Sequence, residues 1–201
     1  MTIKKHYPYI LIVLSLVGIL ASSVLMNDTL KIIQNPEVEL PCNINPLLSC
    51  TAVATKWQSH VFGFPNPILG IISFSLLFGV ALALIYHVIP EDPAFPRPYK
   101  KRKYFWILVN YGALASFVFV VWFFYQSVYN IGNLCLYCMV VWVVTWPIFL
   151  YTTVWNQRES NFSFCQKCFN FISKYHLQIL VSGYLVAILL ILFKFQDFFL
   201  S

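Results

Sequence analysis

The sequence predicts an all-α membrane protein with five transmembrane helices. Of its 201 residues, 60% are hydrophobic and only 10% are charged, whereas soluble domains average about 25% charged residues. Five separate segments approach or exceed the roughly 20 apolar residues that a helix needs to cross the hydrocarbon core. We therefore expect a single membrane domain over residues 1–201, with little room for an aqueous domain.

The five predicted spans follow one another along the chain and contain almost no charge. Lys194 is their one basic residue, and it lies at the end of the last span, where a long side chain can extend to the interface. Charged residues inside a bundle usually mark ion or proton paths, so their absence disfavours a transporter. The predicted spans are residues 7–26, 68–89, 104–125, 134–154 and 177–195.

The first apolar segment also has features of a cleaved signal peptide. Lys4 and Lys5 precede it, and the small residues 21–23 lie near its end. However, its apolar stretch exceeds the roughly 7–15 residues usual for a signal peptide, and no A-x-A-like cleavage site follows it. We therefore expect it to be retained as a span.

The positive charges predict the orientation of the spans. Ten of the 13 Lys and Arg residues fall on one side if the N-terminus, residues 90–103 and residues 155–176 share that side. Only Lys31, Lys56 and Lys194 fall on the other. Because cytoplasmic loops are enriched in Lys and Arg, we expect a protein of the cell (inner or plasma) membrane with a cytoplasmic N-terminus and an extracytoplasmic C-terminus. This bias and anionic lipid explain the net charge of +6 better than nucleic-acid binding does.

Two pairs of cysteines lie on the predicted exterior side. Cys42 and Cys50 belong to the exterior loop 27–66, and Cys135 and Cys138 form a Cys-x-x-Cys motif at the start of the fourth span. Disulfides persist in exterior compartments, and a helix N-terminus lowers the pKa of a nearby thiol. A dithiol at the membrane surface can meet protein thiols on one side and a lipid-soluble electron carrier on the other. The pattern indicates a membrane thiol–disulfide oxidoreductase.

Simpler explanations of the cysteines stay open at this point. The loop pair can be a static structural disulfide, and the Cys-x-x-Cys pair can be two buried core thiols. A further pair, Cys165 and Cys168, falls in a predicted cytoplasmic loop, so the bilayer separates it from the other four cysteines. With His176 as the only nearby histidine, this pair lacks the ligands of a zinc site. We expect no metal, with a site shared across a dimer as the alternative.

The exterior loop ends in an unusual entry to the second span. Residues 62–67 read Phe-Gly-Phe-Pro-Asn-Pro, and Asn66 lies between the two prolines at the membrane boundary. Asparagine is a good helix cap, so capping is one role for Asn66. A loop of about 40 residues without obvious secondary structure is usually functional, which favours a second role for this segment.

These motifs together resemble the vitamin K epoxide reductase family, in particular its bacterial members. The resemblance rests on the paired loop cysteines, the Phe-Gly-x-Pro-Asn-Pro entry and the Cys-x-x-Cys motif, in this order, and it covers roughly residues 7–154. It implies a four-helix bundle around a quinone site, with the fifth span added. Bacterial relatives often carry a fused thioredoxin-like domain; here the chain ends after the fifth span, so the expected partner is a separate extracytoplasmic thioredoxin-like (DsbA-like) protein.

The resemblance implies a two-electron relay through four cysteines, which agrees with the chemistry of thiol–disulfide exchange. The reduced partner attacks the Cys42–Cys50 disulfide, with Cys42 as the expected site of the intermolecular bond. Cys50 then attacks Cys135 and releases Cys138, which is expected to face a membrane quinone, either menaquinone or ubiquinone. The relay supports disulfide formation in secreted proteins. Reduction of vitamin K quinone or epoxide is a further activity that the family name suggests.

The resemblance also implies a quinone-binding site near the outer ends of the second and fourth spans. Asn66 occupies the position of a quinone-contacting asparagine and is expected to donate to the quinone carbonyl. Trp142 stands where vertebrate relatives have tyrosine, and its indole N–H can also donate. Asn66 and Cys138 are expected to meet at one ring. The third span is expected to supply apolar walls from Phe117, Phe119, Trp122 and Phe123.

Two alternative functions remain at the level of the sequence. One is a DsbB-type oxidase, which performs the same chemistry on an unrelated scaffold; the five spans and the Phe-Gly-x-Pro-Asn-Pro entry disfavour it. The other is a non-enzymatic membrane assembly factor whose cysteines only brace the exterior loop.

Overall fold

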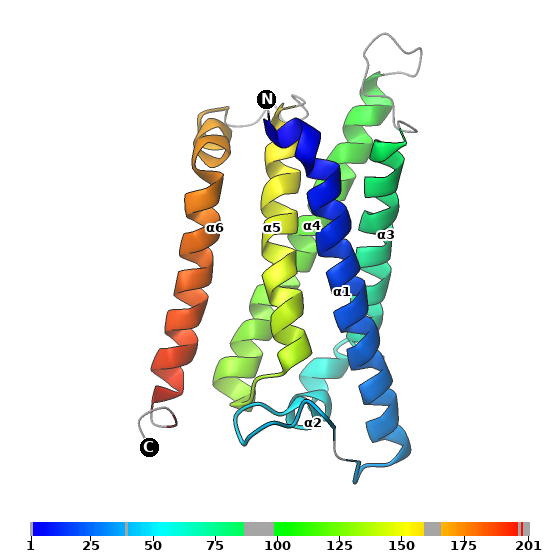
Figure 1. Ribbon diagram of the computed structural model, residues 1–201, viewed down its shortest axis with the longest axis vertical. Coiled ribbons are helices and arrows are strands. Elements are labelled where there is room, and N and C mark those ends of the chain that lie inside the picture. The colour runs from blue at the N-terminus through cyan, green and yellow to red at the C-terminus, as the bar shows by residue number, and fades with distance from the viewer. Residues whose placement is uncertain (1, 39, 87–98, 159–165, 197, 199–201) are drawn as a thin grey trace.

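The computed structural model describes residues 2–38, 40–86, 99–158, 166–196 and 198. Within these residues the chain is helical, and five helices are long and apolar enough to cross a membrane (Figure 1). The prediction of an all-α membrane protein with five spanning helices is confirmed. The helices are α1 (Thr2–Gln34), α2 (Cys50–Ala54), the 3-10 helix η1 (Trp57–His60), α3 (Pro67–Ile85), α4 (Tyr99–Tyr125), the π-helix η2 (Gln126–Ile131), α5 (Leu136–Arg158) and α6 (Gln166–Lys194).

The first helix is longer than the predicted span. The predicted first span ends at residue 26, where the predicted polar loop begins, but α1 continues to Gln34. Asp28 and Lys31 form an ion pair of 3.1 Å along the added turns, and no residue in them breaks a helix. Pro36 follows soon after, and proline disfavours a helical conformation in the residue before it. The predicted loop 27–66 therefore contains the end of α1, α2 and η1 rather than an irregular segment.

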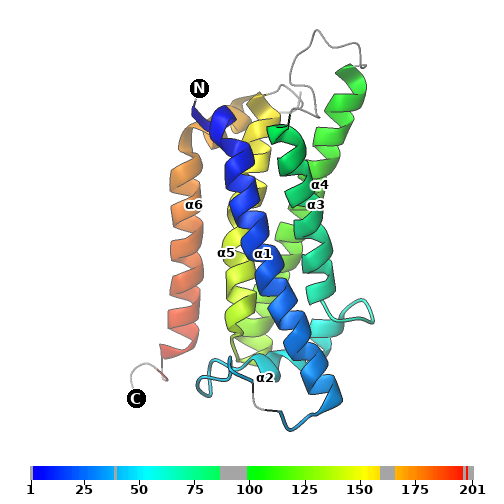
Figure 2. The same cartoon turned by 45° about the vertical axis from the view of Figure 1, so that its right-hand side comes forward.

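The last helix is also longer than predicted, and it is bent. It begins at Gln166 instead of residue 177, and Tyr175 has non-helical backbone angles (φ −109°, ψ 20°). The predicted start of the fifth span thus falls just after this kink. In Figures 1 and 2, α6 stands at the side of the bundle next to α5, and none of its most apolar window is buried in the protein.

Helix α5 is the centre of the bundle, and polar side chains join each neighbour to it. Within its most apolar window, 56% is buried. The Tyr7 hydroxyl of α1 meets Thr152 at 3.1 Å, and Asn110 Nδ2 of α4 donates to Thr153 Oγ1 at 3.0 Å. The Tyr184 hydroxyl of α6 donates to the carbonyl of Val143 at 2.6 Å. Lipid tails are as apolar as leucine side chains, so the hydrophobic effect does not drive helices together inside a membrane. Hydrogen bonds such as these therefore help to fix the positions of the helices in the bundle.

The close packing of α1 against α3 depends on two glycines. A Cβ atom at Gly18 would lie 2.6 Å from the ring of Phe74, and one at Gly70 would meet Ser22. Phe74 is buried at 5% exposure, so its ring has little room to move. Small residues that let two backbones approach are the usual device of membrane helix pairs.

The loop between α1 and α3 covers one end of the bundle. Figures 1 and 2 show α2 there, beside the last turns of α1 and α4 and the first turns of α3 and α5. We call this the α2 end; α1 begins at the opposite end of the bundle, and α6 ends on the same side as α2. Both exterior cysteine pairs of the sequence analysis belong to segments at the α2 end.

Replacing Gly18 by Ala is expected to destabilise the bundle. The added methyl overlaps the buried Phe74 ring, and overpacking of this kind costs about 1–3 kcal/mol. The control is Gly79→Ala in α3, where a Cβ meets nothing within 4 Å and alanine favours the helix by up to about 1 kcal/mol. Thermal unfolding in detergent should show a lower Tm for Gly18→Ala and an unchanged or higher Tm for Gly79→Ala. Equal Tm values would mean that Phe74 moves aside freely.

Candidate redox site

Asparagine side chains hold the loop before α2 in a defined shape. Asn45 Oδ1 accepts hydrogen bonds from the backbone N–H groups of Leu47 (3.0 Å) and Leu48 (2.7 Å). Asn43 Oδ1 accepts from the N–H of Thr51 at 3.2 Å, and Asn43 Nδ2 donates to the Thr51 hydroxyl at 2.9 Å. Local bonds of this kind stabilise turns in competition with regular structure. They fold the segment between Cys42 and Cys50 back on itself.

A short parallel bridge then joins this loop to the residue before the Cys-x-x-Cys motif. Leu48 pairs with Leu134; the N–H of Leu134 donates to the carbonyl of Leu47 at 2.8 Å, and the N–H of Ser49 donates to the carbonyl of Leu134 at 3.0 Å. Gly132 makes the chain reversal before the bridge with a positive φ of 74°, which suits glycine. The bridge therefore sets the register between the loop and α5.

The bridge brings the two cysteine pairs into contact. Cys42 and Cys50 form a disulfide, whereas Cys135 and Cys138 are free thiols. The Sγ atoms of Cys50 and Cys135 lie 3.5 Å apart, and all four cysteines are buried in one apolar cluster. A thiol at this distance from a disulfide sulfur is placed for exchange, in which a thiolate attacks the disulfide.

Cys135 occupies the position immediately before α5, and its surroundings favour the thiolate. Its carbonyl accepts the first bond of the helix, from the N–H of Met139 at 3.0 Å. A hydrogen bond from the Cys138 side chain lowers the pKa of the Cys135 thiol, and the backbone N–H groups of Cys138 and Tyr137 lower it further. Burial and the negative charge of Asp28 act in the opposite direction, but the pKa of Cys135 stays below its ordinary value. The free N–H groups of a helix N-terminus have this effect on thiols.

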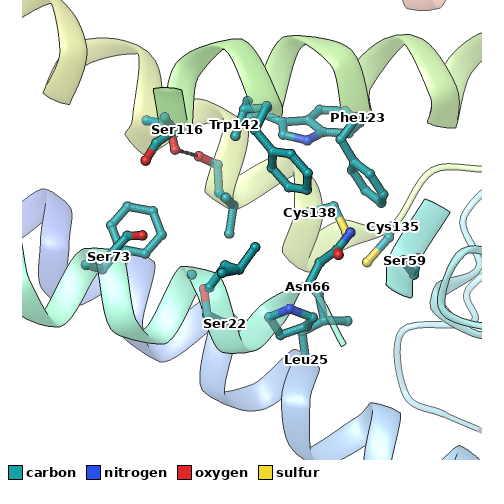
Figure 3. A pocket seen from close by; sticks show the side chains of 18 of the residues that line it. Ser22, Leu25, Ser59, Asn66, Ser73, Ser116, Phe123, Cys135, Cys138 and Trp142 are labelled. Atoms are coloured by element: carbon teal, nitrogen blue, oxygen red, sulfur yellow. Dashed lines mark hydrogen bonds between the residues drawn. The ribbon is translucent and has the colours of Figure 1, made fainter. Parts of the chain in front are cut away.

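A cavity of about 290 Å³ opens beside these thiols (Figure 3). It is lined by residues of α1, α3, α4 and α5 and by the loop, and Cys50, Cys135 and Cys138 reach it. Its walls are mostly apolar. Its size is near the lower end of the range of roughly 300–1,000 Å³ for small-molecule sites. The cavity can therefore hold a compact, largely apolar ring.

Asn66 lies on the wall of this cavity, and its side chain does not cap α3. Its backbone carbonyl accepts from the N–H of Leu69 at 3.0 Å, but its side chain makes no capping bond. Instead, Nδ2 donates to the carbonyl of Gln58 at 2.7 Å, while Oδ1 is buried without a hydrogen-bond partner. One of the two N–H groups and the carbonyl oxygen of Asn66 thus remain to bind a ligand.

The aromatic residues expected around the site divide into two groups. Phe119, Phe123 and Trp142 line the cavity, whereas Phe117 and Trp122 do not. Phe117 stacks instead on Trp146 and Phe149, with ring centroids 4.6 and 5.1 Å apart. Trp142 packs edge-on against Phe124 at 5.0 Å. Among the expected ligand-contacting residues, Asn66, Trp142 and Cys138 therefore share one cavity (Figure 3).

One charged residue beside the site was not expected from the sequence. Asp28 is 3% exposed, and its charge acts on Cys135. The spacing of Leu25, Asp28, Thr29 and Ile32 would have placed it on one helical face with apolar residues, but the sequence analysis ended the helix before it. The further pair lies elsewhere: Cys165 is outside the described residues, as is the side chain of Cys168.

Comparison with known families agrees with this site. The model of the vitamin K epoxide reductase family matches residues 9–153, which is more than half of the chain. No individual curated protein matches it. The matched region contains the loop disulfide, the entry to α3 and the Cys-x-x-Cys motif of α5. The chain is therefore a multi-pass membrane protein that belongs to the vitamin K epoxide reductase family, a family of oxidoreductases.

Proposed function

We propose that this protein oxidises an extracytoplasmic thioredoxin-like (DsbA-like) protein and passes two electrons to a membrane quinone, either menaquinone or ubiquinone. The observation that carries the proposal is the 3.5 Å contact between Cys50 and Cys135, because it links the loop disulfide to a dithiol beside an apolar cavity. In this proposal the α2 end faces the exterior, and the activity supports disulfide formation in secreted proteins.

The cavity residues fit a quinone head group. Apolar walls from Phe119 and Phe123 suit a flat ring. The second N–H of Asn66 can donate to a quinone carbonyl, and its unpaired Oδ1 can accept from a hydroxyl of the reduced ring. When bound, the quinone accepts two electrons and two protons. Asn66 orients the ring and donates to the oxygen that gains negative charge. The indole of Trp142 forms a wall of the same cavity, with an N–H that can also donate.

The relay can be written so that each disulfide bond is balanced. It starts with both pairs oxidised. The partner thiolate attacks Cys42, and Cys50 leaves as a thiolate; Cys50 then attacks Cys135, and Cys138 leaves as a thiolate. The partner's second thiolate closes its own disulfide and releases Cys42. Cys42 attacks Cys50, which restores the loop disulfide and releases Cys135.

The relay then holds one disulfide and one dithiol, which is the arrangement of the Cys42–Cys50 bond and the free Cys135 and Cys138 thiols. Closing the Cys135–Cys138 disulfide gives up two electrons to the acceptor and returns the protein to its starting state. The lowered pKa of Cys135 makes it a good leaving group in exchange with Cys50. Cys138 is the relay thiol placed within α5, next to the cavity.

Two other functions have less support. A DsbB-type oxidase on an unrelated scaffold disagrees with the family match over residues 9–153. An assembly factor braced by a structural disulfide leaves unexplained the two buried free thiols, one of which touches that disulfide.

Replacing Cys138 by Ala is expected to abolish quinone reduction, because no second thiol is then left to close the disulfide with Cys135. In the companion variant Cys50→Ala, the lone Cys42 thiol can still form a mixed disulfide by attacking the disulfide of the oxidised partner, but no electrons should pass inward to Cys135. The control is the double change of Cys165 and Cys168 to Ser, which should retain turnover. Quinone reduction and trapped partner are measured on the purified proteins. Near wild-type turnover by Cys138→Ala would refute the relay.

Replacing Asn66 by Ala is expected to slow quinone reduction by about 10²–10³, the usual effect of losing one donor to developing charge. Exchange between the partner and the loop disulfide should continue, because it does not use the cavity. Trp142→Phe is the comparison, since it keeps an aromatic ring in the cavity wall while it removes the indole N–H. Both rates are measured in each variant. If neither rate changes in Asn66→Ala, the residue has no part in acceptor binding.

The proposed orientation has its own test. Reporter fusions within residues 27–66 and at the C-terminus should both report an exterior location, because ten of the 13 Lys and Arg residues lie on the other side. A fusion at the N-terminus is the control and should report the cytoplasm. A cytoplasmic signal from the loop would place the cysteines in the wrong compartment and end the proposal.

A further inference from the structure

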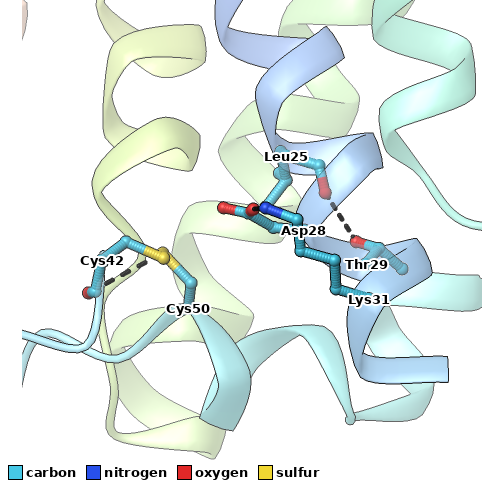
Figure 4. A network of polar contacts seen from close by, with 6 residues as sticks. All are labelled: Leu25, Asp28, Thr29, Lys31, Cys42 and Cys50. Carbon is cyan, nitrogen blue, oxygen red and sulfur yellow. Dashed lines mark hydrogen bonds and ion pairs between the residues drawn. A yellow bond between two sulfur atoms is a disulfide. The ribbon is translucent and has the colours of Figure 1, made fainter. Parts of the chain in front are cut away.

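The mechanism above moves electrons but leaves one buried ionisable group at the redox site unused. Asp28 lies on the face of α1 that packs on the cysteines: Leu25 and Ile32, three residues before and four after it, belong to the apolar cluster that contains all four sulfurs. Thr29 on the same face lines the cavity. Figure 4 shows the Asp28 side chain pointing from α1 toward the Cys42–Cys50 disulfide.

One of the two carboxylate oxygens of Asp28 has a hydrogen-bond partner and the other has none. Its Oδ1 accepts from Lys31 Nζ at 3.1 Å, and the Lys31 side chain is 47% exposed. Its Oδ2 is buried and has no hydrogen-bond partner. An unpaired buried carboxylate oxygen is costly, and a group retained at such a cost beside reacting atoms is a candidate for proton transfer. The exposed Lys31 links this pair to water.

We propose that Asp28 exchanges a proton with Cys135 during the relay and passes that proton to or from the water around Lys31. The proposal rests on the proposed function, since it assigns a proton path to the same exchange. Of the carboxylates among the described residues, Asp28 and Glu37, only Asp28 is buried. The charge of Asp28 reaches Cys135, where it raises the pKa that the neighbouring hydrogen bonds lower.

The proton step accompanies the exchange between the two sulfur pairs. The Cys135 thiol gives its proton to Asp28 and becomes a thiolate, which bonds to Cys50 while the Cys42–Cys50 bond breaks and Cys42 leaves as a thiolate. In the relay direction Cys42 attacks Cys50, Cys135 leaves with the electron pair, and protonated Asp28 returns the proton. One disulfide replaces another, so the step needs no outside oxidant or reductant.

The titratable and charged groups around Asp28 come from three elements. Lys31 lies on α1 itself and pairs with Asp28, and Cys135, Tyr137 and Cys138, at the start of α5, lie in or against the apolar cluster on which this face of α1 packs. From the loop and α2 come Cys42 and Cys50, which do not titrate while they are bonded to each other. Cys135 lies just before the membrane-spanning part of α5, and it is the relay thiol whose pKa the charge of Asp28 raises.

The test follows the internal exchange without quinone or partner. Protein with the loop disulfide and free Cys135 and Cys138 is held at acid pH, where exchange is frozen because the thiol is protonated. A jump to a chosen pH starts it. Peptide mapping after acid quench and maleimide labelling then measures the rate at which the Cys50–Cys135 bond forms. The Cys135 titration is followed separately by thiolate absorbance, with Cys135→Ser as the blank.

In Asp28→Asn we expect two changes of opposite direction. Near neutral pH the exchange slows about 10²-fold, because the proton acceptor is lost; at alkaline pH the difference disappears, because hydroxide removes the proton. The Cys135 titration moves down by about half a pH unit to one unit, because a negative charge is removed. Slower exchange therefore accompanies a more acidic thiol, a combination that loss of packing alone does not produce.

Two further variants keep the test decisive. Glu37→Gln removes an exposed carboxylate and should change neither the rate nor the titration. Lys31→Gln keeps Asp28 but removes the exposed cation that joins it to water, so the exchange should slow near neutral pH and keep its wild-type rate at alkaline pH. If Asp28→Asn does not fold, the Lys31→Gln variant tests the proton role of Asp28. Wild-type rates and Cys135 titration in Asp28→Asn, or a wild-type exchange rate near neutral pH in Lys31→Gln, would overturn the proton role. Absence of exchange in the wild type would instead overturn the relay.

Discussion

The pairing of Leu48 with Leu134 is the contact on which the redox site depends. Two backbone hydrogen bonds, of 2.8 and 3.0 Å, hold the loop against the residue before α5. Cys50 follows the paired residue by two positions and Cys135 follows Leu134 by one, so the register of this bridge sets the 3.5 Å distance between their sulfurs. Since exchange requires the sulfurs to collide, a slip of one residue would separate the two cysteine pairs.

The bridge is effective because α5 is itself held firmly. Hydrogen bonds between Tyr7 and Thr152, Asn110 and Thr153, and Tyr184 and Val143 attach α1, α4 and α6 to it, so the helix that carries the reactive thiol has a fixed place in the bundle. The same turn supplies the N–H groups that stabilise the Cys135 thiolate. The centre of the fold and the reactive thiol are thus parts of one helix, and changes in bundle packing reach the chemistry through it.

The sequence was sufficient for the spans and the cysteine motifs, because hydropathy and spacing are local properties. It was insufficient where contacts between helices determine the end of a helix or the direction of a side chain. The end of α1 was placed at residue 26 since polar residues follow, yet the Asp28–Lys31 ion pair and the packing of Ile32 on the cysteines extend the helix. Asp28 was missed for that reason. Phe117 was expected on the cavity, but its stacking on Trp146 turns it to another part of the bundle, which the sequence pattern did not reveal.

The surroundings of the sulfurs explain why a separate proton group is required. Electrons move inward as one sulfur attacks the next, and the four cysteines are close enough to need no other carrier. Protons cannot follow that route, because the cluster is apolar and disulfide sulfurs carry none. Cys50 and Cys135, whose sulfurs are in contact, are fully buried. In the proposed arrangement electrons enter from the loop toward the cavity, while protons pass between the sulfurs and water along α1, through Asp28 and Lys31. The extension of α1 beyond the predicted span is then a functional feature, since it carries the carboxylate to the sulfurs and its cation to water.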